Sequence, residues 1–191
     1  MGSIIDIVAS LTLRGAIVIA VLNMTIALQG KLSEKTAQAN MFNLTTTISR
    51  VMTNDLNMVG YQVSSNYFTY ASQDTIEVNY LDPSTGFQTW VKYFAGSTTE
   101  LSGTSNPKDR KLYRAIGTAG AGLATPSVLA NGVVTLQFTY YDASGNTLSS
   151  PVNKSSIRSF KVYLVMATGD QVNNLYPSAE WTFRFIPPNI N

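Results

Sequence analysis

Two ionisable side chains stand inside an apolar segment near the start of the chain. Residues 4–28 read IIDIVASLTLRGAIVIAVLNMTIAL, in which Asp6 and Arg14 are the only ionisable groups. Ionisable groups in such a segment are costly and are usually paired. These two are eight residues apart, about two turns of a helix, so they share one side but cannot reach each other. The spacing indicates that their partners lie on a neighbouring copy of the chain.

The composition argues against catalysis. The 191 residues include no His and no Cys, so the commonest general base, the commonest metal ligand and any thiolate nucleophile are missing. An enzyme would then need a pair of carboxylates, and no spacing indicates one. We expect no enzyme, no catalytic residue, no metal and no cofactor. The net charge of +2 gives no electrostatic basis for binding nucleic acid.

Other polar groups fit local structure better than a site. Asp142, Ser144 and Asn146 could offer oxygens to calcium, but the carboxylate count is too low for a calcium loop, and the segment has the chemistry of a hairpin turn. Asp82, in LDPSTG, has the same interpretation. Asn153 begins an N-x-S/T sequon in an expected loop and is a possible glycosylation site; an unmodified asparagine is the alternative.

The apolar segment predicts a helix that enters a membrane or the core of an assembly. A helix of about 25 residues is about 38 Å long, enough to cross a bilayer core of about 30 Å. The basic start and the small-residue cleavage site of a signal peptide are missing, so we expect no cleavage within this segment. The expected assembly surface consists of Asp6, Arg14, Ile4, Ile5, Val8, Leu11, Ile17 and Val21.

The helical pattern continues beyond the apolar segment. From residue 31 the apolar residues recur at spacings of three and four, which is the helical period. At Gly30 the helix changes from apolar on all sides to amphipathic. We expect the helix to loosen or bend there, because Gly is unfavourable inside a helix. Gly60 and Tyr61 are the expected C-cap. The apolar stripe consists of Met41, Leu44, Ile48, Val51, Met52, Leu56 and Val59.

The rest of the chain reads as β structure. Six strands are expected, at 74–80, 87–94, 111–116, 133–141, 157–167 and 180–186, with 117–130 as a loop. In the last strand, Trp181, Phe183 and Phe185 should point inward. Strands and turns without helical patterns between them favour an antiparallel sheet. The predicted fold is α+β, with a long N-terminal helix (1–60, apolar in 1–30 and amphipathic in 31–60) packed on an antiparallel β domain (61–191).

Four motifs, in order along the chain, resemble the type IV pilins and pseudopilins, and among them the minor-pilin and J-type pseudopilin branch. Residues 54–61 (NDLNMVGY) resemble its helix-ending D-L-x-x-x-G-Y, and residues 111–114 (KLYR) resemble its G-x-L-Y-R strand. Residues 132–145 resemble V-x-x-L-x-F-x-Y-Y-D-x-x-G, and residues 157–162 resemble I-R-x-V. The resemblance extends from the first helix almost to the C-terminus.

The resemblance implies a role for Asp6. It stands within a residue of the family's glutamate, which is thought to meet the N-terminal amine of a neighbouring subunit during assembly. The other interpretation of Asp6 is an interfacial acid near the favourable end of the helix dipole. The sequence departs from the family in lacking its basic leader and the phenylalanine that follows, which leaves open whether a leader peptide is removed.

Three functions follow as expectations. The first is a structural subunit of an extracellular filament like a type IV pilus, which polymerises with copies of itself through the apolar helix. The second is a minor pseudopilin that primes or tips a pilus or secretion filament. The third is a membrane-anchored β binding module of another class, for example one that binds glycans. Charged residues make up only 13% of the chain, against about 25% in typical soluble domains, which suits a secreted or wall-associated protein. The resemblance implies a cell-surface location after an inner-membrane precursor state, with the pilus or secretion assembly machinery as a partner.

Overall fold

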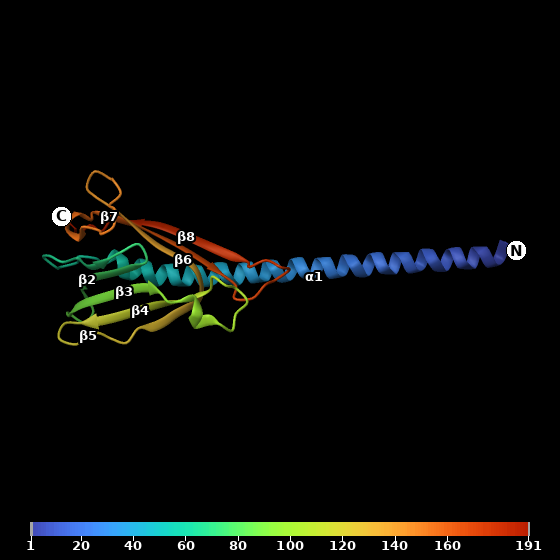
Figure 1. The fold of residues 1–191 in the computed structure, drawn as a ribbon, viewed down its shortest axis with the longest axis horizontal. Coiled ribbons are helices and arrows are strands. Elements are labelled where there is room, and N and C mark those ends of the chain that lie inside the picture. Colours follow the sequence, from blue (N-terminus) through green and yellow to red (C-terminus); the bar gives the residue numbers. More distant parts are fainter. Residues whose placement is uncertain (1, 191) are drawn as a thin grey trace.

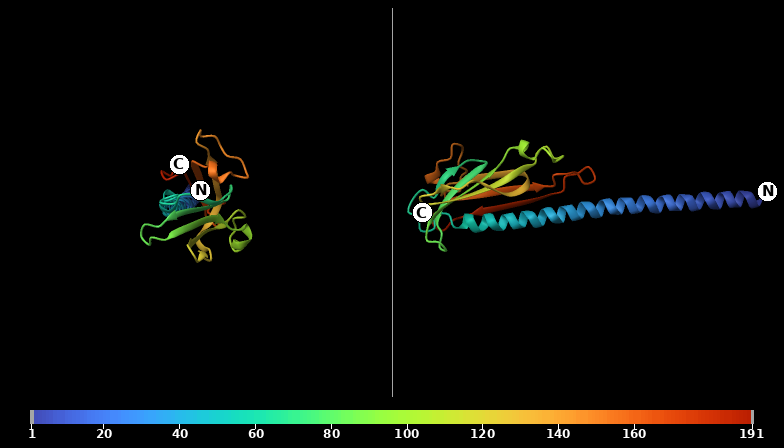
Figure 2. Two further views of the ribbon diagram at one scale, coloured as in Figure 1. Left: turned by 90° about the vertical axis from the view of Figure 1, so that its left-hand side faces the viewer. Right: turned by 90° about the horizontal axis from the view of Figure 1, so that it is seen from below.

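A single long helix and one β-sheet form the molecule, in a computed structural model that describes residues 2–190 (Figure 1). The helix, α1, spans Gly2–Asn57 and has 56 residues. At 1.5 Å per residue its length is about 84 Å. Its C-terminal half lies along the sheet, whereas its N-terminal half projects beyond the sheet (Figures 1 and 2).

The sheet is antiparallel throughout the described residues, and its order is β1-β2-β3-β4-β6-β7-β8, with β5 paired to β4. Short 3₁₀ helices, η1 (Thr98–Leu101) and η2 (Lys154–Ser156), lie in two of the connections. The strands are β1 (Phe68–Ala71), β2 (Thr75–Leu81), β3 (Gln88–Ala95), β4 (Arg110–Thr118), β5 (Gly122–Leu123), β6 (Ser127–Tyr141), β7 (Ser159–Ala167) and β8 (Ser178–Phe185).

The predicted α+β fold is confirmed, and the strand predictions need three corrections. The expected loop at 117–130 contains β5 and the first residues of β6. Its Gly and Ala content weakened the strand signal, but backbone pairing to β4 compensates. The short edge strand β1 was missed. Phe183 is 43% exposed, because β8 is the edge of the sheet; Trp181 and Phe185 do lie in or against the core.

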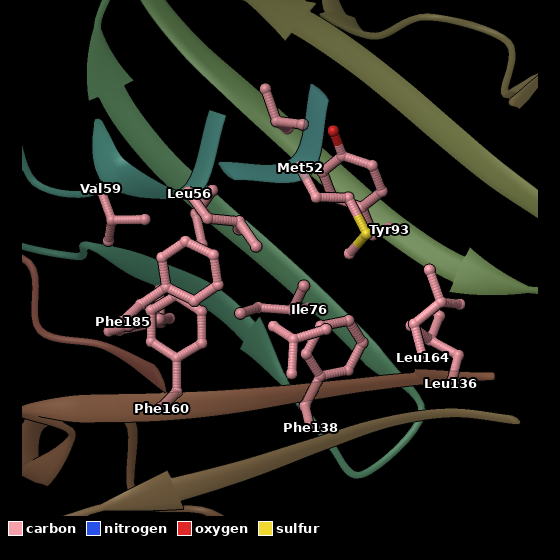
Figure 3. Close-up of a cluster of buried hydrophobic side chains, with 14 of the residues drawn as sticks. Met52, Leu56, Val59, Ile76, Tyr93, Leu136, Phe138, Phe160, Leu164 and Phe185 are labelled. Carbon is pink, nitrogen blue, oxygen red and sulfur yellow. The ribbon is translucent and has the colours of Figure 1, made fainter. Parts of the chain in front are cut away.

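The core lies between α1 and the inner face of the sheet. Leu56 points from the helix toward Phe160 and Phe185 of β7 and β8, and Met52 lies beside Tyr93 of β3 (Figure 3). The Phe160 and Phe185 rings stack with their centroids 5.0 Å apart. The predicted stripe is confirmed: Ile48, Met52, Leu56 and Val59 are buried, and Met41, Leu44 and Val51 are half-buried.

The helix ends earlier than the predicted cap. α1 ends at Asn57, and Gly60 lies in the turn that follows, with φ +75°. A side chain there would also meet the Tyr67 ring, 2.9 Å from the Cβ position. The Gly60 amide donates to the Asn79 carbonyl at 2.9 Å. Gly60 therefore turns the chain from the helix onto the edge of β2. The division into 1–60 and 61–191 stays a prediction, since the helix and the sheet share one core.

Candidate assembly surface

The N-terminal half of α1 touches no other part of the described chain. Every large apolar side chain from Ile4 to Leu28 is at least half exposed, from 71% at Ile4 to 52% at Leu28. The helix is long and apolar enough to cross a membrane, and its most apolar window is 0% buried. The predicted surface residues Ile5, Val8, Leu11, Ile17 and Val21 are 55–67% exposed. A contiguous apolar surface of this extent marks a protein or membrane contact.

The two charges of this segment have no partner within the described chain. Asp6 and Arg14 are exposed, and the ion pairs between residues 2 and 190 are those of Arg114 with Asp55 and of Lys92 with Glu77. The structure therefore keeps Asp6 and Arg14 on the helix surface and does not bring them together.

The apolar surface extends further than the sequence pattern predicted. Leu32 and Phe42 are 66% and 62% exposed, on the part of α1 whose other side faces the sheet. Phe42 is 14 residues beyond Leu28, about 21 Å along the helix axis. The pattern did not single it out because one aromatic among polar residues carries little periodic signal. Exposure in the folded chain is what identifies it.

A partly buried ion pair fixes the other half of α1 to the sheet. Asp55, which is 8% exposed, accepts two hydrogen bonds from Arg114 of β4, each at 2.8 Å. Tyr93 of β3, opposite Arg114 in the sheet register, donates its hydroxyl to the same carboxylate. Two-point pairing of this kind fixes orientation as well as distance. The helix-ending motif and the K-L-Y-R motif thus meet, although they are 59 residues apart in the chain.

The electrostatics keep Tyr93 and Arg114 protonated. Burial, and then the neighbouring Asp55 carboxylate, raise the pKa of Tyr93, so its hydroxyl stays a donor. Burial is the largest single influence on Arg114 and opposes its charge, but the hydrogen bonds and charges of Asp55 and Tyr93 together outweigh burial, so the pKa of Arg114 is raised. Tyr93 and Arg114 therefore both keep their protons and anchor the helix as hydrogen-bond donors.

A second contact holds the helix where its two halves meet. Asn173, in the loop between β7 and β8, donates its side-chain amide to the Gly30 carbonyl at 2.7 Å. A Cβ on Gly30 would come within 3.0 Å of that amide group. In the single chain α1 runs through Gly30 without a break, so the expected loosening is not seen there. For an assembled state the bend at Gly30 stays a prediction.

The other polar residues that are candidate sites in the sequence form hydrogen bonds within local turns or cap a short helix. The Asp142 carboxylate accepts the backbone amides of Ser144 and Asn146 at 2.9 and 2.8 Å, which confirms the turn. These bonds, the one to the Asn146 amide first, lower the pKa of Asp142. Asp82 accepts from the backbone and hydroxyl of Ser84 in the same way. Asn153 is exposed and caps η2; its glycosylation stays a prediction.

Comparison with known proteins adds no identification: no family model, curated protein or solved structure matches the chain.

Proposed function

We propose that the protein is a structural subunit of an extracellular filament like a type IV pilus, built by packing the N-terminal halves of α1 from many copies. The observation that carries the proposal is the bare apolar surface of residues 4–28 on a helix whose other half is docked firmly on the sheet. Such a subunit offers a rigid rod to its neighbours. A contact of this kind that does not close on itself gives an open helical polymer.

Phe42 favours a protein partner over lipid as the final environment. If residues 4–28 filled a bilayer, Phe42 would lie about 21 Å outside the apolar span and would remain in water. A neighbouring helix in a filament would cover Phe42 together with the apolar segment. In this proposal the membrane holds the subunit before assembly, and the cell surface is where the filament resides.

The two charges set a further requirement on the packing. In a parallel bundle, Asp6 of one copy faces Arg14 of another when the helices are shifted along their axes by about 12 Å, which is eight residues. Each copy would then use both charges. Pairing would remove the cost of carrying ionisable groups in an apolar core.

A charge-swap experiment tests the filament and this register together. Asp6→Arg and Arg14→Asp alone should each abolish fibres in sheared surface material, as seen by electron microscopy, because like charges then face one another. The double exchange should restore fibres. If the wild-type protein forms no fibres once freed from the membrane, the filament proposal fails; if the double exchange stays defective while the wild type assembles, only the register fails.

Phe42 supplies the matched test against a plain membrane anchor. Phe42→Ser should weaken or abolish fibres, whereas Phe87→Ser, at a residue 61% exposed in the β2–β3 turn, should leave them intact. Both variants should stay in the membrane fraction of cells. If Phe42→Ser leaves the yield of fibres unchanged, the helix bundle does not extend to this part of α1.

A minor pseudopilin that primes or tips a filament is the second candidate. The observation that supports it is the pairing of Asp55 with Arg114, because both lie in the motifs that resemble the minor-pilin and J-type branch. Abundance separates the two candidates. A major subunit should dominate sheared surface material, whereas a priming subunit should be present there only in trace amounts by quantitative mass spectrometry.

A membrane-anchored β binding module is the third candidate. It requires that deletion of residues 1–30 leave full ligand binding and that no polymer exist. We propose no enzymatic activity.

A further inference from the structure

The outer face of the sheet carries a cavity that the helix does not use. Ile76, Val78 and Tyr80 of β2 point into the core, so the alternate residues of β2, which include Asn79, point to the opposite face. A cavity of about 350 Å³ lies there, within the range of small-ligand pockets of about 300–1,000 Å³. It is lined by Gln62, Val63, Ser64, Ser65, Asn66, Thr69, Asn79, Leu81, Gln88 and Trp90.

A buried amide oxygen without a hydrogen-bond partner lies in the wall of this cavity. Asn79 is 2% exposed, and its Oδ1 has no hydrogen-bond partner within residues 2–190. A buried polar atom without a partner costs about 1–3 kcal/mol. Asn79 is therefore either satisfied by a group from outside the chain or destabilising. Its position on the cavity wall shows where such a group would enter.

Trp90 forms the apolar part of the wall. It lies directly opposite Asn79 in the pairing of β2 with β3. Its indole is half-buried and stacks on no other aromatic ring among the described residues. Trp90 also borders a second hollow of about 430 Å³, with Glu77, Thr118 and Leu123 among its lining. The ring is thus accessible from two adjoining hollows along one face of the sheet.

The loop over the cavity is held in an unusual backbone conformation. Gln62 and Asn66, at the two ends of its lining segment, have φ +50° and +58°. Side chains other than Gly adopt this region rarely, and Gln more rarely than Asn. Such conformations cluster at functional sites. The conformation places the polar residues of 62–66 on the cavity wall, opposite β2 and β3.

The lining chemistry defines the ligand. None of the lining residues of the first cavity is charged, and seven of the ten are Ser, Thr, Asn or Gln. Because no Lys or Arg side chain lines this cavity, anionic ligands such as phosphates and carboxylates are disfavoured. Amides and hydroxyls both donate and accept, which matches a ligand rich in hydroxyl groups. A half-buried indole offers an apolar face together with an N–H donor.

We infer that this cavity is a binding site for a neutral carbohydrate, with one face of a sugar ring packed on Trp90 and its hydroxyls bonded to Asn79 and Gln88. The second hollow beyond Trp90 gives room for a further ring of an oligosaccharide. The neighbouring cavity on the other side of residues 64–66 differs, because Lys154 and Arg158 line it. Sugar binding at Trp90 is independent of whether copies of the chain polymerise.

The test uses the full chain in a zwitterionic detergent, since a detergent with a sugar head group would compete. A Trp181→Phe background leaves Trp90 as the only indole, because the chain has two Trp. Methyl glycosides of glucose, galactose, mannose and N-acetylglucosamine, and their linear tetramers, are added up to about 10 mM, which covers Kd values weaker than 1 mM. At least one sugar should shift the Trp90 emission with saturation, and a tetramer should bind more tightly than its monomer.

Two variants and a matched control assign the binding to this cavity. Trp90→Ala and Asn79→Leu should each weaken binding tenfold or more, measured by calorimetry because the first variant lacks the indole. Gln137→Ala, in a cavity formed by β6 that has no Trp in its lining, should bind as the parent does. Asn79→Leu should also leave the thermal midpoint unchanged or raised, because it removes an unsatisfied amide. If Asn79→Leu fails to fold, Trp90→Phe, with binding weakened severalfold, takes its place.

Three results would overturn the inference. The first is no saturable response to any sugar of the panel. The second is binding that neither Trp90→Ala nor the Asn79 and Trp90→Phe variants alter. The third is equal binding of an uncharged acetylated trialanine amide, which would assign the cavity to peptides.

Discussion

The two halves of α1 differ in environment, although they belong to one unbroken helix. In residues 4–28 most positions are apolar and all are exposed, whereas in residues 41–59 one stripe is apolar and buried. The first half has neither an ion pair nor a packed partner within the described residues. The second half has both, in the Asp55–Arg114 pair and the aromatic core. A helix that is apolar all round requires an outside partner, whereas a striped one is satisfied by its own sheet.

The comparison teaches that the same residue type has different consequences in the two halves. A leucine of the second half contributes to the free energy of unfolding of the single chain. A leucine of the first half contributes only once a membrane or another copy covers it. Stability and assembly should therefore be separable by substitution, and the predictions that follow run from the largest expected effect to the smallest.

Deleting residues 2–28 should abolish membrane association and polymer formation completely, because it removes the bare apolar surface. The thermal midpoint of the remaining protein should change little, since none of the side chains of residues 4–28 packs in the core. Sedimentation with membranes and scanning calorimetry measure the two effects. A large fall in the midpoint would show that the apolar half supports the fold of the sheet.

Asp55→Ala should lower the free energy of unfolding by about 3 kcal/mol, because it leaves the half-buried Arg114 guanidinium and the buried Tyr93 hydroxyl without their shared partner. The control is Glu77→Ala, whose partner Lys92 is 3.8 Å away and more exposed; its effect should stay below about 1 kcal/mol. Urea unfolding followed by circular dichroism gives both values. Equal effects would mean that the Asp55 cluster does not anchor the helix.

Leu56→Ala and Leu22→Ala place one substitution in each half. Leu56 is 0% exposed, and its loss should cost about 2–5 kcal/mol of unfolding free energy. Leu22 is 56% exposed, and its loss should change that free energy by less than about 0.5 kcal/mol while weakening polymerisation. Chemical denaturation and fibre yield are the measurements. A comparable loss of stability in both variants would remove the distinction between the halves.

Alkaline pH should lower the stability of the β domain and should leave the apolar half of α1 unaffected. Burial raises the pKa of Tyr93 and Tyr140. Stability is therefore full below the unfolded pKa of about 10 and falls as pH rises above it, because the unfolded chain loses protons first. From pH 10 to 11 the loss is about 1 kcal/mol for each tyrosine. Residues 4–28 contain neither Tyr nor Lys.

Thermal midpoints at pH 9, 10 and 11 measure this effect, with Tyr140→Phe as the comparison. In the variant, the part of the fall in thermal midpoint with pH that Tyr93 and Tyr140 cause together should be about halved. A wild-type thermal midpoint that stays constant up to pH 11 would contradict the predicted loss of stability at alkaline pH.

Gly15→Ala and Gly30→Ala should produce the smallest difference. Nothing lies within 4 Å of a Cβ on Gly15, so the substitution should stabilise the helix by up to about 1 kcal/mol. At Gly30 the new methyl group meets the Asn173 side chain, so the gain should be smaller and the β7–β8 loop should become more mobile. Hydrogen exchange of the amides near residues 30 and 173 reports both effects. An equal gain at the two positions would show that the Asn173 contact is weak.

The sequence by itself determined the elements whose signal is local and repeated. The apolar run of 4–28, the stripe from Met41 to Leu56 and the turns at Asp82 and Asp142 follow from side-chain period and turn chemistry, and the structure places each in the expected element. The antiparallel sheet followed from strands separated by short turns. β5 and the start of β6 were missed, because their residues have weak strand preference and are held by backbone pairing to β4.

The tertiary structure decided which distant residues meet. Nothing in the spacing pairs Asp55 with Arg114, places Asn173 on Gly30 or leaves Phe42 uncovered. The same holds for Asn79 and Trp90, which read as ordinary strand residues and become the wall of a cavity through strand register and the course of residues 62–66. Local patterns fix the type of an element, whereas contacts between elements depend on the packing of the whole sheet against the helix.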